Sequence, residues 1–61
     1  MTKPTRVREE LWKAVCAANI YEGSVLVEPH RSEQRFRIRT NGDTSRRVVD
    51  MEGLLLIQEA V

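Results

Sequence analysis

Cysteine and histidine each occur only once in this 61-residue chain, as Cys16 and His30. A single cysteine excludes an intramolecular disulfide, and one cysteine with one histidine cannot supply a structural zinc site with the usual ligand spacing. An unpaired cysteine is typical of a reducing compartment. The first four residues are polar and lead directly into charged sequence, so we expect no signal peptide and a cytoplasmic protein.

Long hydrophobic runs are also lacking. The longest run of large aliphatic residues, 54–57, is far shorter than the roughly 20 residues that a membrane-spanning helix requires. The three glycines are widely separated and form no phosphate-binding loop. We therefore expect no membrane contact and no nucleotide cofactor.

Groups for catalysis are scarce. Glu9 and Glu10 are adjacent, so on a helix they point about 100° apart and make no acid/base pair. Cys16 falls within a predicted helix, whereas His30 follows Pro29 in a predicted loop. We therefore expect no enzyme, with no catalytic residue, no metal, no cofactor and no small-molecule substrate.

What remains has the composition of a globular domain, with 41% hydrophobic and 31% charged residues. Hydrophobic periodicity predicts a helix over residues 6 to 19 or 20, capped by Thr5 and closed by Glu22-Gly23. Strands are predicted over residues 24–28, 34–40 and 45–49, and Asp50 is a good N-cap for a closing helix. The sequence thus predicts one α+β domain over residues 1–61, in the order α-β-β-β-α, with a three-stranded antiparallel sheet packed on two helices.

The segment Arg35-Phe36-Arg37-Ile38-Arg39 alternates charged and apolar residues, which in a strand separates an arginine face from a core face. Asn-Gly follows at positions 41–42 and favours a tight hairpin. A two-residue loop would pair Phe36 with Arg47. A three-residue loop with a bulge would pair Phe36 with Val48 and add Arg47 to the open face; we prefer it because fewer charges are then buried.

Charge is unevenly distributed along the chain. Residues 30–47 hold six arginines against two acidic residues, a balance of +4, and the rest of the chain has a balance of −3. The six arginines are the candidate binding residues for nucleic acid or for an acidic partner: Arg31, Arg35, Arg37, Arg39, Arg46 and Arg47. The alternative is that they are merely solvated or paired with Glu28 or Glu33.

Two functions fit these residues. In the first, the hairpin binds a nucleic-acid backbone and the protein is a small regulator or accessory factor. Because Phe36 points to the core, no aromatic is left on the arginine face for base stacking, and single-strand readout is not expected. In the second, the chain is a protein-binding inhibitor or adaptor, of the type that phages and mobile elements encode, and docks on an acidic protein surface.

Two apolar stripes lie outside the main apolar arcs of the predicted helices. Trp12, Cys16 and Ile20 recur at helical spacing on the first helix, and Met51 and Leu55 lie together on the last. Either a tight monomer buries wide arcs of both helices, or these residues form a protein interface. We favour the interface, with a homodimer as its simplest form.

The order of elements and the length resemble the double-stranded-RNA-binding-domain-like fold, including the small HicA toxins. Gly23-Ser24 before the first strand and Arg46-Arg47-Val48 before the final helix lie roughly where that toxin family has similar segments. The catalytic histidine of that family follows the Gly-Ser pair, and this chain has Val25 there. The resemblance therefore implies a shared fold without ribonuclease activity.

Overall fold

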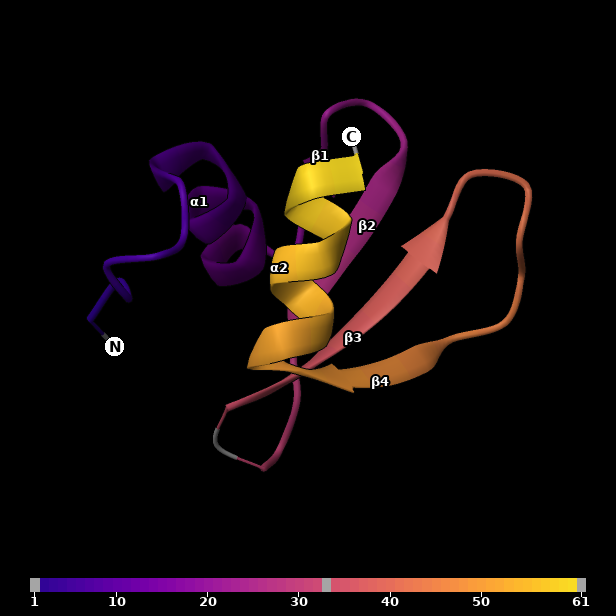
Figure 1. Cartoon of the computed structure of the whole chain (residues 1–61). Coiled ribbons are helices and arrows are strands. Elements are labelled where there is room, and N and C mark those ends of the chain that lie inside the picture. The colour runs from indigo at the N-terminus through magenta and orange to yellow at the C-terminus, as the bar shows by residue number, and fades with distance from the viewer. Residues whose placement is uncertain (1, 33, 61) are drawn as a thin grey trace.

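The computed structural model describes residues 2–32 and 34–60 of the chain. It confirms the α+β class and the antiparallel sheet, but the sheet has four strands instead of three, in the order β1-β2-β3-β4. Along the chain the elements are α1 (Glu9–Ala17), β1 (Ile20–Tyr21), β2 (Val25–Pro29), β3 (Arg35–Thr40), β4 (Arg47–Asp50) and α2 (Met51–Ala60) (Figure 1).

The additional strand, β1, begins at Ile20, where the sequence predicted the end of the first helix, and continues to Tyr21. Helix α1 stops earlier because Ala18 adopts a left-handed φ of 50°, and the N–H of Asn19 then closes the helix on the carbonyl of Ala14 at 2.8 Å. The chain continues as a strand and returns through Glu22 and Gly23, with φ of 53° and 72°. Positive φ at both central residues is the pattern of a type I′ turn, the tight hairpin turn whose twist suits the flanking strands.

The two helix starts differ in how well the sequence predicted them. Thr5 is not the N-cap of α1, because that helix begins only at Glu9, and its cap residue Arg8 makes no side-chain capping bond. The backbone N–H of Arg8 instead donates to Oε1 of Gln58 on α2, at 2.8 Å. Asp50 does cap α2, since its Oδ1 accepts a hydrogen bond from the N–H of Gly53 at 3.0 Å.

Both helices cover the same face of the sheet, with α1 against β1 and β2 and α2 against β3 and β4 (Figure 1). The core between the layers combines apolar residues from both helices, from three of the strands and from Val7 before α1. Its fully buried side chains are Val7, Leu11, Val15, Val27 and Leu54. The opposite face of the sheet carries no helix and is therefore open.

The β3–β4 hairpin has neither of the registers considered from the sequence. Phe36 lies opposite Val49, Arg37 opposite Val48 and Ile38 opposite Arg47, so the preferred three-residue loop was wrong. Six residues, 41–46, connect the strands.

The turn at Asn41-Gly42 explains this longer connection. Only Gly42 has a positive φ there, of 86°, and the N–H of Asp43 bonds to the carbonyl of Thr40 at 3.0 Å. That pattern belongs to a type II turn, which splays the flanking strands where a type I′ turn would join them tightly.

Within the described ranges, neither helix combines the length and the apolar character needed to cross a membrane.

Candidate functional site: the open face of the sheet

The open face of the sheet displays the odd-numbered residues of β3. Arg35, Arg37 and Arg39 follow one another along this strand, spaced roughly 6.6 Å apart at the usual strand rise. Phe36 and Ile38 alternate with them and are buried on the helix side, with exposed fractions of 2% and 8%. The separation of the strand into an arginine face and a core face is thus present as predicted.

Among the described residues, one carboxylate forms ion pairs within this face. Glu28 of β2 is the cross-strand neighbour of Arg37, and its Oε1 lies 4.0 Å from Nη1 of Arg37 and 3.3 Å from Nη1 of Arg46. The pairing of arginines with Glu28 is therefore real for these two side chains. Glu33, the other acid expected to pair with this face, lies outside the described residues.

The two ends of the arginine row form no ion pair with a described residue, although Asp50 lies opposite Arg35 across the β3–β4 pairing and uses its Oδ1 to cap α2. Among residues 2–32 and 34–60, no acidic oxygen lies within 4.0 Å of the guanidinium of Arg35 or Arg39, nor of Arg31 in the loop before β3. No described ion pair offsets the charges of these arginines, whereas Glu28 offsets part of the charge at the middle of the row.

Arg47 is not part of this face. The observed register places it opposite Ile38, so it shares the helix side of the sheet, and its Nη2 lies 3.4 Å from Oδ2 of Asp43. Of the six candidate arginines, the structure brings four together on the open side: Arg35, Arg37, Arg39 and Arg46.

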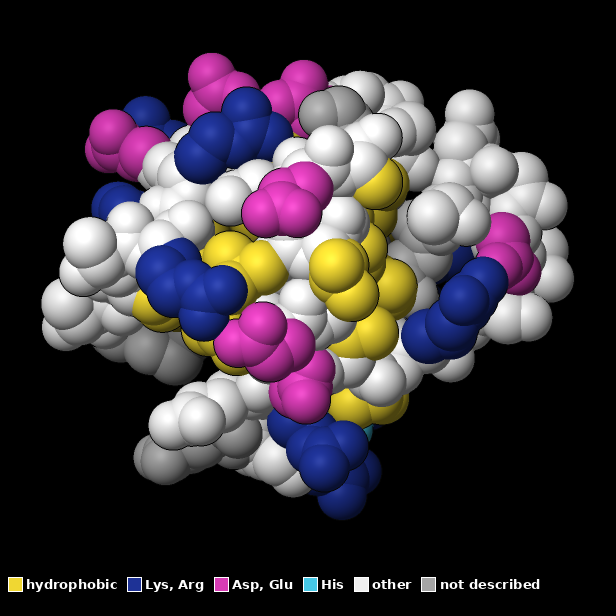
Figure 2. Space-filling model, in the orientation of Figure 1, with side chains coloured by type: hydrophobic (Ala, Val, Ile, Leu, Met, Phe, Trp, Pro, Cys, Tyr) yellow, Lys and Arg dark blue, Asp and Glu magenta, His cyan; other side chains and the backbone are white. Residues whose placement is uncertain are grey.

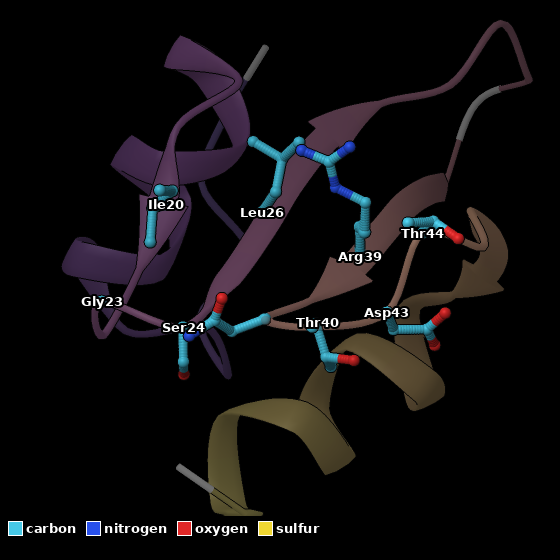
Figure 3. Close-up of a pocket in the computed structure, with 10 residues that line it drawn as sticks. Ile20, Gly23, Ser24, Leu26, Arg39, Thr40, Asp43 and Thr44 are labelled. Atoms are coloured by element: carbon cyan, nitrogen blue, oxygen red, sulfur yellow. The ribbon is translucent and has the colours of Figure 1, made fainter.

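A pocket of about 340 Å³ lies at the Arg39 end of the row, between the β1–β2 turn and the β3–β4 loop (Figure 3). Ile20, Leu26 and Arg39 are successive cross-strand neighbours on three strands and line it together. The two turns are joined by a hydrogen bond from the N–H of Asn41 to the carbonyl of Ser24, at 2.8 Å. This pocket was not predicted, because Ile20 was expected on the first helix; the Glu22-Gly23 pair was the signal that could have indicated a hairpin there.

Asp43 also lines the pocket, but its carboxylate is held within the loop. The backbone N–H of Ser45 donates to its Oδ1 at 2.8 Å, and with the guanidinium of Arg47 this keeps the pKa of Asp43 below its ordinary value. Asp43 is therefore ionised at neutral pH and stabilises the conformation of the loop through these two contacts.

The other titratable candidates do not converge on the pocket. Nδ1 of His30 accepts a hydrogen bond from the N–H of Ser32 within the β2–β3 loop, at 3.2 Å. Cys16 is exposed on α1. In the described part of the chain, no three His, Cys, Asp or Glu side chains gather in a way that could hold a metal ion.

The predicted apolar interface stripes are largely taken up by the core. Trp12 and Leu55 are only 9% and 6% exposed, so they cannot be exposed interface anchors, and their expected exposure was wrong. Ile20 is not on the helix at all, and Met51 packs partly buried against the core. Of these five residues only Cys16 and Ile20 are exposed, on different elements, and whether either meets a partner stays a prediction.

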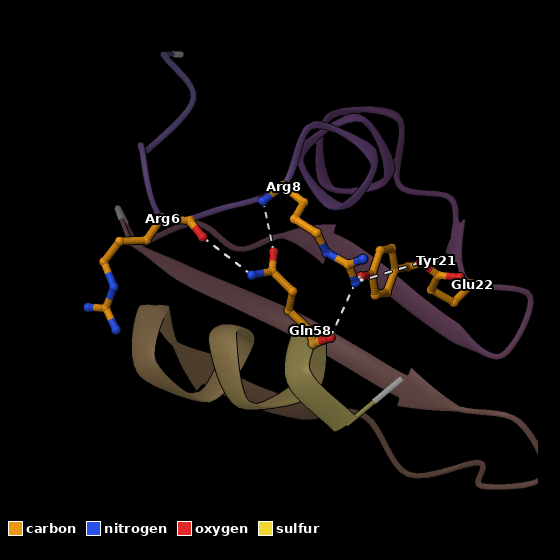
Figure 4. Close-up of polar contacts among 5 residues, drawn as sticks. All are labelled: Arg6, Arg8, Tyr21, Glu22 and Gln58. Atoms are coloured by element: carbon orange, nitrogen blue, oxygen red, sulfur yellow. Dashed lines mark hydrogen bonds and ion pairs between the residues drawn. The ribbon is translucent and has the colours of Figure 1, made fainter.

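The basic residues near the helices are engaged in holding the fold together. The guanidinium of Arg8 stacks 5.5 Å from the Tyr21 ring centre, donates to the hydroxyl of Tyr21, and reaches the carbonyl of Gln58 at 3.3 Å (Figure 4). Nη1 of Arg6 lies 3.0 Å from Oε1 of Glu52. Figure 2 shows this helix-bearing side with apolar, acidic and basic side chains intermixed. The described arginines that form no ion pair therefore lie on β3 or in the loop before it: Arg31, Arg35 and Arg39.

Comparison with known families gives a match over most of the chain. The sequence model of a family described as CRISPR-associated protein (Cas_Cas2CT1978) matches residues 2–56. Members of the Cas2 family are typically endoribonucleases, so this match contradicts the expectation that the chain is not an enzyme. The error arose because the sequence analysis required paired catalytic groups or a ligand motif that could be read from residue spacing alone.

The match does not point to the toxin family that the order of elements resembles, and the four-stranded sheet departs from the three strands on which that resemblance was based. No curated protein and no solved structure matches the chain. Because residues 2–56 cover nearly all of its 61 residues, the chain belongs to the CRISPR-associated Cas_Cas2CT1978 family.

Proposed function

We propose that this CRISPR-associated protein binds the phosphate backbone of a nucleic acid on the open face of its sheet. The observation that carries the proposal is the row of Arg35, Arg37 and Arg39 on an uncovered face, with no described ion pair at either end of the row. A guanidinium can donate two parallel hydrogen bonds to a phosphate, which fixes both its position and its orientation.

RNA is the nucleic acid that the family favours, because its typical members are endoribonucleases. In this proposal the arginine row holds the RNA strand by its backbone and positions it on the protein. The alternative partner, an acidic protein surface, has no specific observation in its favour.

The test removes the two arginines that have no described acidic partner. The double variant Arg35→Gln/Arg39→Gln should weaken RNA binding about tenfold per arginine, because a hydrogen bond to a charged group contributes roughly 1.5 kcal/mol. The slope of log affinity against log salt should also fall by about 2, one counterion for each lost phosphate contact. Both quantities are measured by fluorescence anisotropy with a labelled RNA at several salt concentrations.

The matched control is Arg6→Gln/Lys13→Gln, which removes the same charge from exposed positions on the helix side. It should change affinity less than about threefold, since exposed charges beyond a Debye length are largely screened. Equal losses in the two double variants would show that only net charge matters and would overturn the proposed site.

A further inference from the structure

The pocket beside Arg39 differs in chemistry from the rest of the arginine face. Ile20 is 56% exposed and, with Leu26, gives the pocket an apolar wall on β1 and β2 (Figure 3). Arg39 stands next to Leu26 on β3 and adds a planar cation. A phosphate alone would gain nothing from the apolar wall, whereas a flat ring would gain from both the wall and the guanidinium.

The other residues that line the pocket do not favour a metal ion, or a cationic ligand that would bind a carboxylate. Asp43 is the acidic residue among the pocket residues, and its two oxygens are engaged by Ser45 and Arg47. The other walls are turn residues, including Gly23 and Gly42, at which an added Cβ would meet no atom within 4 Å. A volume of about 340 Å³ lies at the lower end of the range for small-ligand sites.

We infer that this pocket accepts a single unpaired nucleobase from the strand whose backbone lies on the arginine row. The base would lie against Ile20 and Leu26 and stack with the guanidinium of Arg39. This inference rests on the proposed function, and it adds a preference: a base inside a duplex is paired and stacked, so the protein should favour RNA with unpaired nucleotides over a blunt duplex.

The position of the pocket supports continuity with the row. Arg39 belongs to both, as the last arginine of β3 and as a wall of the pocket. A strand following Arg35, Arg37 and Arg39 would therefore pass the mouth of the pocket, and one base could turn into it. The sequence predicted no base recognition because it found no aromatic on this face; the apolar wall becomes visible only when β1 joins the sheet.

The first experiment is an NMR titration of the amide resonances with the four ribonucleoside 5′-monophosphates, and with ribose 5-phosphate as the ligand that lacks a base. The nucleotides should shift the amides of Gly23, Ser24 and Thr44, whereas ribose 5-phosphate should leave them in place. Equal shifts with ribose 5-phosphate would mean that no base enters, and would overturn the inference.

The second experiment uses a matched pair of truncations on the same face. Leu26→Ala should lower nucleotide affinity about fivefold or more, because it removes apolar surface from the wall against which the base would lie. Val48→Ala, which shortens an apolar side chain on β4 outside the pocket, should lower it less than twofold. Arg39→Lys should also weaken nucleotide binding, because an ammonium keeps the charge but loses the planar stacking surface. Similar losses in the Leu26 and Val48 variants would overturn the inference.

Different results would overturn the two proposals, the backbone site on the arginine row and the base pocket. Blunt duplex RNA that binds through the arginine row, with no nucleotide-dependent shift at the pocket, would overturn the pocket and leave the backbone site intact. Nucleotides that shift the pocket amides while no RNA binds the row would overturn the backbone site and retain the pocket. Leu26→Ala should retain binding of blunt duplex RNA, and a loss there as large as its loss for nucleotides would also count against a separate base site.

Discussion

Gly53 lies in the first turns of α2, where a Cβ built on its backbone would stand 2.8 Å from Cβ of Val49 and 3.2 Å from its Cγ1. Val49 is the last residue but one of β4 and packs against the core. Its Cβ is fixed to the strand backbone and cannot turn away as the end of a long side chain could. The strand and the helix therefore approach each other closely because position 53 has no side chain.

Gly53→Ala should consequently destabilise the protein, although helix propensity alone would favour alanine by roughly 1 kcal/mol. Overpacking a tight contact costs about 1–3 kcal/mol, so the net loss should be about 1 kcal/mol, measured by urea unfolding. The double variant Val49→Gly/Gly53→Ala should show a favourable coupling between the two sites, because glycine at position 49 removes the Cβ that the added Cβ would meet at 2.8 Å. A stabilised Gly53→Ala variant would show that helix propensity exceeds packing at this contact.

In the β3–β4 loop, the carboxylate of Asp43 helps to fix the conformation of the backbone. Asp43 accepts from the N–H of Ser45 and pairs with Arg47 at the start of β4, which links the loop to the strand that follows it. Both contacts favour the ionised form, so the pKa of Asp43 lies below its ordinary value, with the backbone hydrogen bond as the larger cause. These two contacts therefore stabilise the loop as long as the carboxylate of Asp43 is charged.

A pH titration should show this coupling. Because the folded-state pKa is lowered, the stabilising contribution of Asp43 is present above the ordinary aspartate pKa and is lost as pH falls through the lowered value. Arg47→Gln should raise the pKa of Asp43 only part of the way, since the N–H of Ser45 remains. The carboxyl ¹³C shift of Asp43 reports the pKa, and a full return to the ordinary aspartate range in this variant would assign the main effect to Arg47.

At the same scale, long periodic elements could be predicted from the sequence and short ones could not. β3 was found almost to the residue because its alternation fixes both the element and its faces, and Asp50 was identified as a cap from its residue type. β1 has only two residues, which is too short for any periodicity, and it exists through its pairing with β2. The type I′ turn occurs at Glu22-Gly23, where a non-glycine residue adopts positive φ, and Asn41-Gly42 forms a different turn.

The candidate site was predictable from the sequence only where a single strand determined it. The arginine row followed from the alternation within one strand, whereas the exclusion of Arg47 depended on a hairpin register that local sequence does not determine. The pocket required three strands to be placed side by side, so no single segment indicated it. Local patterns therefore identified the charged side chains, and tertiary pairing decided which of them act together.

Across the whole molecule, the two faces of the sheet have separate roles. The helix side contains the core, and its basic residues Arg6 and Arg8 are bound to groups within the protein. The open side carries the arginine row and the pocket, with Glu28 as the acidic residue that pairs with two of its arginines. Because of this division, residues on the open face can be substituted without disturbing the packing of the core. Variants at Arg35 or Arg39 should therefore keep the stability of the parent protein.

Trp12 tests the assignment of the apolar stripe to the core of the single chain. Truncating a buried tryptophan costs about 3–5 kcal/mol, and a domain of this size has a total stability of roughly 3–9 kcal/mol. Trp12→Ala should therefore remove about half or more of this stability and lower the midpoint of urea unfolding at 25 °C accordingly. Leu56→Ala, on an exposed side chain of α2 that is 67% accessible, should change stability by less than about 0.5 kcal/mol.

The mass in solution separates this result from a role of Trp12 at an interface between copies. A core residue affects the unfolding transition and leaves the mass of the remaining folded fraction unchanged, because no contact between chains is lost. An interface residue would do the reverse, since each chain would keep its own packing when separated from its partner. Light scattering measures this mass. A Trp12→Ala variant that stays folded but has a lower mass than the parent would show that Trp12 acts at the predicted interface and not in the core of the single chain.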